Sequence, residues 1–234
     1  MRKKVGLILL VWVGLLSACT TPGESTHVTR ANQDFELGDI AKTDINLVIE
    51  AHHREALGYL RLLALKLYQF NPRQWEKSGS HSAQASVDRM FNSRHNWNFS
   101  ELEGATGADA IHLSLDESFQ GDRVLAFTVG LGSMIIASYE GKYDFFVIDS
   151  LDAQKLNNSA RNLEIAAWKL YRSHDPEGNP LIQTGGSGNT TQNLSFERLF
   201  GKIIAVQDLM SKIVAQKTKR GVKSAIQFLM FLPI

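Results

Sequence analysis

Three long segments of this sequence place apolar residues at helical spacing. Between Thr43 and Phe70, apolar and semi-apolar side chains recur in alternating steps of four and three residues, which is the repeat of one helical face. This stripe consists of Ile45, Ile49, His52, Ala56, Tyr59, Leu63, Leu67 and Phe70. The segment ends before Pro72, because the residue that precedes a proline disfavours helical angles. The pattern therefore predicts a helix over 44–70.

Two later segments repeat this spacing. One runs from 151 to 173 and carries Leu156, Ala160, Leu163, Ala167 and Leu170 on one face. The other runs from 194 to 220 and carries Phe196, Leu199, Ile203, Val206, Met210 and Ile213. Gly221 follows the second segment and is expected to close it, because glycine is common just after a helix. Shorter helices are expected near 86–94 and 109–120.

The apolar segment 123–149 fits two structures. A helix places small residues along one side, where another backbone can approach closely. These small residues are Ala126, Gly130, Ser133 and Ala137. The later part, 134–149, is rich in aromatic and β-branched residues and also fits a β-hairpin that turns at Glu140-Gly141. We favour the helix and keep the hairpin as the alternative.

These patterns predict a mostly α protein, an irregular helical bundle with a minor β-hairpin near 134–149 as the alternative. Residues 39–234 are expected to form one domain, because about 200 residues can bury a sufficient apolar core. The stretch 174–193 is polar and rich in proline and glycine, so we expect a long loop, which is either functional or disordered.

The first nineteen residues follow the pattern of a secretory signal peptide. Arg2, Lys3 and Lys4 precede an uncharged apolar run from 5 to 16, and Ser17-Ala18 forms a small-residue exit. The apolar run is too short for a spanning helix, which needs about 20 residues. Leu16-Ser17-Ala18-Cys19 resembles the lipobox of bacterial lipoproteins.

This resemblance implies cleavage after Ala18 and a diacylglycerol thioether on Cys19, usually with a further acyl chain on the freed amine. Members that lack an aspartate after the cysteine are sorted to the outer membrane, and here Thr20 follows. Residues 19–38 then act as a lipidated flexible tether that holds a periplasm-facing domain at the outer membrane. Cys19 is the only cysteine, so lipidation also removes a thiol that has no partner within the chain.

The charge balance excludes one class of partner. The full sequence has 25 basic and 24 acidic residues, and cleavage after Ala18 removes three of the basic ones, which leaves a formal charge of −2. A nearly balanced chain lacks the basic footprint of a nucleic-acid-binding protein. We therefore expect no nucleic-acid partner.

No stretch of the sequence carries a catalytic signature, so we predict no catalytic, metal-binding or cofactor-binding residue. Glu50 and His53 have the i, i+3 spacing of helix-bundle carboxylate metal sites, but the second such motif that those sites need is absent. We expect Glu50 to pair with Arg54 at the surface. His52 is expected to lie in the core with its ring nitrogens hydrogen-bonded.

The last residues form the candidate interaction site. Its members are Phe228, Leu229, Met230, Phe231 and Leu232, within a run that almost lacks polar spacing. This run is either the last core helix or an exposed patch for a partner or a membrane surface. The basic stretch 217–223 that precedes it would suit an anionic headgroup layer.

These features together predict a non-enzymatic envelope lipoprotein: a scaffold, a pilotin-like protein, or an assembly or accessory subunit of an envelope or secretion machine. Its expected partners are the bilayer, through acylated Cys19, and envelope proteins or further copies of the chain. The first alternative is a carrier or sensor of an apolar ligand such as a lipid. The second is a hydrolase that acts on the envelope.

Overall fold

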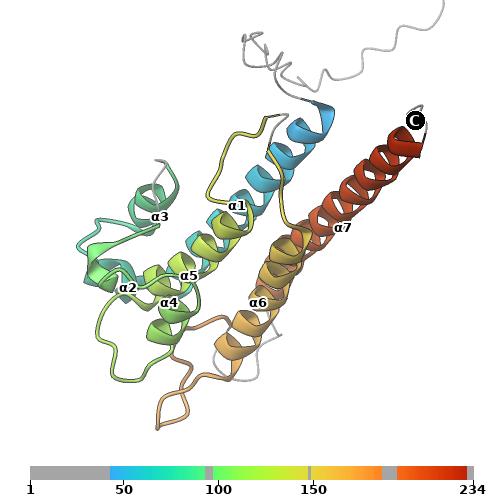
Figure 1. Ribbon diagram of the computed structural model, residues 1–234. Coiled ribbons are helices and arrows are strands. Elements are labelled where there is room, and N and C mark those ends of the chain that lie inside the picture. The colour runs from blue at the N-terminus through green and yellow to red at the C-terminus, as the bar shows by residue number, and fades with distance from the viewer. Residues whose placement is uncertain (1–42, 93–96, 147–148, 186–193, 231–234) are drawn as a thin grey trace, which may run out of the picture. The chain divides into compact units, whose positions relative to one another are not determined.

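The computed structural model describes residues 43–92, 97–146, 149–185 and 194–230, all within one compact unit, Leu37–Ile234. This part of the chain is mostly helical and contains no β-sheet, which confirms the predicted helical bundle (Figure 1). The elements are α1 (Asp44–Phe70), α2 (Pro72–Lys77), α3 (Ala83–Phe91), the 3₁₀ turn η2 (Ser100–Leu102), α4 (Gly107–Ser114), α5 (Arg123–Ser138), α6 (Ala153–Arg172) and α7 (Ser195–Met230). None of the helices in these ranges is long and apolar enough to span a bilayer.

Helix α7 runs antiparallel to both α1 and α6, the other two long helices (Figure 1). The ring of Phe70, at the end of α1, meets that of Phe196 near the start of α7, with centroids 5.3 Å apart. Ser211, further along α7, donates a hydrogen bond of 2.8 Å to the carbonyl of Ala153 in the first turn of α6. The apolar faces of α1 and α6 therefore both pack against α7 and build much of the core.

Helix α5 is the most deeply buried element. Every residue from Arg123 to Gly132 is buried, which explains why this segment lacks the polar face of the other helices. At Gly130, an added Cβ would lie 2.7 Å from the carbonyl oxygen of Gly107 in α4. The predicted close approach along the small-residue face is thus confirmed, and Ser133 on the same face accepts a hydrogen bond of 2.7 Å from the Gly107 amide.

The alternative hairpin near 134–149 is wrong for the described residues. Helix α5 continues to Ser138, because Ile135 and Ile136 both bury their side chains on the helix. The chain then turns at Glu140 and Gly141, whose φ angles are +57° and +71°. These left-handed angles end the helix, and the residues that follow up to 146 form no strand.

The start of α5 is fixed by two buried polar side chains. Asp122 caps the helix by accepting hydrogen bonds from the Leu125 amide at 2.9 Å and the Tyr68 hydroxyl at 2.8 Å. Burial raises the pKa of Asp122. Arg123 donates hydrogen bonds to the carbonyls of Ser114, Asp116 and Glu117, so the residues after α4 are tied to α5.

The ends of the helices differ from the predictions at several places. Helix α7 continues through Gly221 to Met230, so the predicted closure at Gly221 is wrong. One glycine costs a helix only about 1 kcal/mol, and the lysines and arginine around it are good helix formers. The expected helices near 86–94 and 109–120 begin earlier, as α3 and α4.

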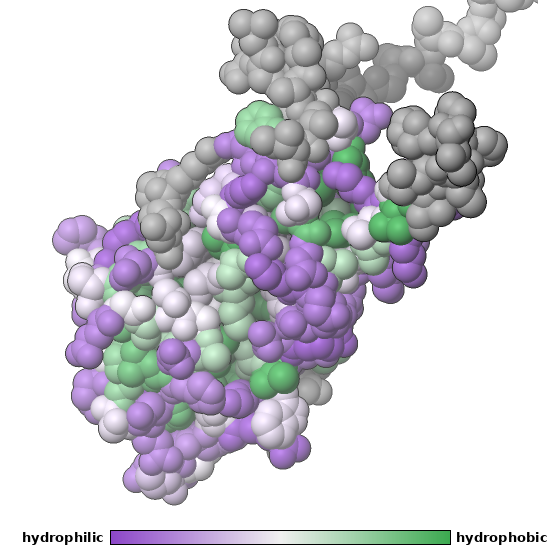
Figure 2. Space-filling view, in the orientation of Figure 1, coloured by the Kyte–Doolittle hydropathy of each residue, from purple (hydrophilic) through white to green (hydrophobic). Residues whose placement is uncertain are grey.

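The first part of the expected loop 174–193 is folded against the helices. Gln183 and Asn71 exchange two hydrogen bonds, of 2.8 and 2.9 Å, and Ile182 is buried in the core. The remaining part, 186–193, lies outside the described residues. On the face shown in Figure 2, hydrophobic residues reach the surface only in patches among hydrophilic ones.

Candidate functional site

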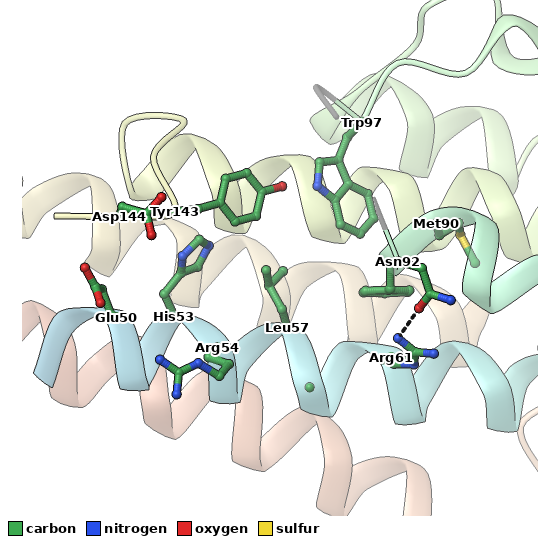
Figure 3. A pocket seen from close by; sticks show the side chains of 12 residues that line it. Glu50, His53, Arg54, Leu57, Arg61, Met90, Asn92, Trp97, Tyr143 and Asp144 are labelled. Atoms are coloured by element: carbon green, nitrogen blue, oxygen red, sulfur yellow. Dashed lines mark hydrogen bonds between the residues drawn. The ribbon is translucent and has the colours of Figure 1, made fainter. Parts of the chain in front are cut away.

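A cleft of about 420 Å³ opens between α1, the end of α3 and the segment that follows α5 (Figure 3). It combines aromatic, apolar and charged side chains. The lining residues are Glu50, His53, Arg54, Leu57, Gly58, Arg61, Met90, Phe91, Asn92, Trp97, Tyr143 and Asp144. Six of these twelve residues come from α1, so one face of this helix forms the floor of the cleft.

The floor follows from the helical repeat of α1. His53, Leu57 and Arg61 are each four residues apart, and this spacing places them along one side of a helix. The polar side chains of Glu50 and Arg61 lie at the two ends of this floor, and Leu57 lies between them (Figure 3). Gly58 adds open space, because no atom outside its own helix backbone lies within 4 Å of where its Cβ would be.

His53 lies at the inner end of the cleft and is only 2% exposed. Its ring stacks on Tyr139 at a centroid distance of 4.3 Å, and Tyr143 and Phe145 pack around it at 5.3 and 6.4 Å. Among the described residues, its Nε2 atom has no hydrogen-bond partner. Burial lowers the pKa of His53 to about 4, so the ring is neutral at pH 7.

The segment after α5 carries Tyr143 and Asp144 to the cleft. It is tied to α1 by a hydrogen bond of 2.9 Å from the amide of Phe145 to the Oε1 atom of Glu50. Within the segment itself, Lys142 and Asp149 form an ion pair. These contacts position Tyr143 above the floor, where Figure 3 shows its hydroxyl directed toward Trp97.

Trp97 forms the facing wall and is 2% exposed. Its six-membered ring lies against α5 at Gly132, where an added Cβ would be 2.3 Å from the ring. Phe91 meets Trp97 edge-on at a centroid distance of 5.2 Å. At the outer end of the cleft, Arg61 donates to Asn92 at 2.8 Å and forms an ion pair with Asp88.

His53 is poorly placed to act as a general base. A general base must reach the proton that it removes, whereas the Nε2 atom of His53 is buried below the cleft surface. Tryptophan, tyrosine and arginine side chains, in contrast, contribute most of the binding energy at protein interfaces. In the described part of the chain, no group of three or more His, Cys, Asp or Glu side chains could hold a metal ion.

The prediction that His52 lies in the core is wrong. His53, and not His52, occupies the core, and His52 is half-buried, with its Nδ1 atom 2.8 Å from the carbonyl oxygen of Val48. Because α1 packs against both α5 and α7, its buried face extends beyond the predicted stripe and includes Asn46, His53 and Leu60. Glu50, predicted to pair with Arg54, uses its carboxylate to hold the Phe145 amide.

Of the predicted site residues, only three fall within a described helix. Cys19 is outside the described residues, as are Phe231 and Leu232. Phe228, Leu229 and Met230 belong to the last turns of α7. Sequence reasoning missed Trp97 and Tyr143, which lie in segments without a periodic pattern.

Comparison with known proteins identified no relative of this chain. No protein-family model, curated protein or solved structure matches this chain. The function must therefore be inferred from the residues of the chain and their geometry.

Proposed function

We propose that this chain is a lipid-anchored envelope protein, attached to the outer membrane through Cys19 and facing the periplasm. Its role is that of a non-enzymatic accessory or assembly subunit that binds a segment of a partner protein in the cleft of Figure 3. The lipobox-like Leu16-Ser17-Ala18-Cys19 supports the anchor. The aromatic and charged residues that line the cleft support the binding function.

The cleft supports this role because rigid aromatic walls are combined with exposed charge. Tyr143 is half-buried and offers ring surface that its contact with His53 holds in place, so its ordering costs little entropy on binding. The buried ring of Trp97 packs against Phe91 and keeps the facing wall rigid. Arg54 lines the cleft from α1, is exposed, and can pair with a carboxylate or a carbonyl of the partner. An anchored protein with such a cleft is suited to hold an extended segment of another envelope protein.

A carrier of an apolar ligand is the second candidate. Leu57, Met90 and Phe91 give the cleft an apolar side, and about 420 Å³ is within the usual range of small-molecule pockets. The two candidates differ in what is bound after extraction from the membrane: an envelope protein or a lipid-like molecule.

Gly58→Trp is expected to abolish partner binding. Because Gly58 faces open space in the cleft, an indole there fills the volume that a partner segment would occupy without displacing the core. Tagged protein is extracted from its own membranes in mild detergent, and co-purifying envelope proteins are quantified by mass spectrometry. The specific partner is expected to fall by at least about tenfold, as for the loss of a central contact.

Gly58→Ala is the matched control, because it adds one methyl group and leaves the cleft open. It should retain the partner at the level of the unaltered protein. Equal recovery of all envelope proteins with Gly58→Trp would contradict the proposal. Recovery of a lipid-like molecule, lost only in Gly58→Trp, would replace partner binding with the carrier function.

A further inference from the structure

The last part of α7 extends beyond the helical body. Val214 is the last buried residue whose side-chain environment is described, and every residue from Gln216 to Ser224 is exposed, including Val222 at 55%. The helix nevertheless continues to Met230. We call Gln216–Met230 the arm; at 1.5 Å per residue it is about 22 Å long.

The arm points away from the body at the end where α1 begins. Helices α1 and α7 are antiparallel, with Phe70 against Phe196 and Lys202 over the ring of Tyr59 at 4.7 Å. This register brings the first turn of α1 level with the start of the arm, and Figure 1 shows both at the same end of the helical body. Asp44, where α1 begins at this end, follows Cys19 by 25 residues in the sequence.

The arm is strongly basic. From Leu209 to Ile234 the sequence has five cations and no acidic residue. These cations are Lys212, Lys217, Lys219, Arg220 and Lys223, all of them exposed. The stretch 226–234 that follows is almost entirely apolar, but it is shorter than half of a spanning helix.

We propose that the arm lies on the anionic surface of the membrane to which Cys19 is anchored. Its exposed cations, at 217, 219, 220 and 223, meet lipid phosphates. A helical segment of this length is only marginally stable alone in water, so the surface also stabilises it. This proposal rests on the proposed membrane anchor, and the body then makes two contacts with one bilayer.

The test uses the mature chain with Cys19→Ala, produced without the leader, so that lipidation contributes nothing. Its flotation is measured with vesicles of phosphatidylethanolamine and phosphatidylglycerol, and with neutral phosphatidylcholine vesicles. Each basic residue near an anionic surface strengthens binding by about fivefold. Reversal of the four arm cations, Lys217→Glu, Lys219→Glu, Arg220→Glu and Lys223→Glu, is therefore expected to weaken binding to the anionic vesicles at least about 100-fold.

The matched control reverses four exposed cations at the opposite end of the body: Arg73→Glu, Lys77→Glu, Arg172→Glu and Arg198→Glu. This variant has the same net charge and should bind like the unreversed chain. Equal loss in both variants, or no flotation of the unreversed chain, would overturn the proposal. A dimer that depends on the arm, without vesicle binding, would assign the arm to a second copy instead. Because Gly58 lies outside the arm, partner recovery with Gly58→Trp tests the cleft separately.

Discussion

Gly130→Ala is expected to lower the free energy of unfolding by about 2 kcal/mol, and Gly130→Val by more. The added Cβ would lie 2.5 Å from a side-chain carbon of Ile111 and 2.7 Å from the carbonyl oxygen of Gly107. The second neighbour is backbone, so α4 as a whole must move away from α5. Chemical denaturation, followed by circular dichroism, measures the difference.

Gly58→Ala is again the matched control, because both glycines lie within helices and receive the same methyl group. At Gly58 the new Cβ meets open space, so the higher helix propensity of alanine should raise the free energy of unfolding by about 0.5–1 kcal/mol. The two changes are thus expected to have opposite signs. A neutral or stabilising Gly130→Ala would show that α4 and α5 do not pack as closely as described.

Lowering the pH from 7 to 4 is expected to remove about 3 kcal/mol of stability through His53 alone. The pKa of His53 is lowered from 6.5 to about 4 by burial. Below pH 6.5 the unfolded chain therefore binds a proton that the folded chain does not. The stability that the neutral His53 ring contributes is fully present above pH 6.5, and it is lost as the pH falls toward 4.

The measurement is the free energy of unfolding of the unaltered protein and of His53→Phe at each pH. The variant should lose about 3 kcal/mol less between pH 7 and pH 4. His53→Gln is smaller and also uncharged, so it serves if phenylalanine overfills the site. His52→Phe is the matched control and should keep the full acid sensitivity. Identical pH profiles for His53→Phe and the unaltered protein would contradict a buried, neutral His53.

The helical architecture could be predicted because its signal is local. The stripes of α1, α6 and α7 repeat every three to four residues, and each element buries one face. The close contact at Gly130 could also be predicted, because a row of small residues on one helix face allows another backbone to approach closely. The end of α7 was not, because Gly221 marks a helix end only when the residues after it stop favouring the helix.

The cleft could not be predicted, because it depends on contacts between distant parts of the chain. His53 is packed by Tyr139 and Phe145, more than 80 residues away, and no periodic pattern connects them. Trp97 packs against α5 because Gly132, which has no side chain, leaves room for the indole ring. Glycine in a buried helix was the available signal, but it does not identify which side chain fills the space.

The membrane anchor is tested most directly by the mass of the N-terminal peptide of protein isolated from its own membranes. If the chain is lipid-anchored as proposed, the mature protein begins at Cys19, and this residue carries a diacylglycerol group, usually with a further acyl chain on its amine. A peptide that begins elsewhere, or a Cys19 with a free thiol, would contradict the membrane anchor, and with it the envelope role proposed for the cleft and the arm.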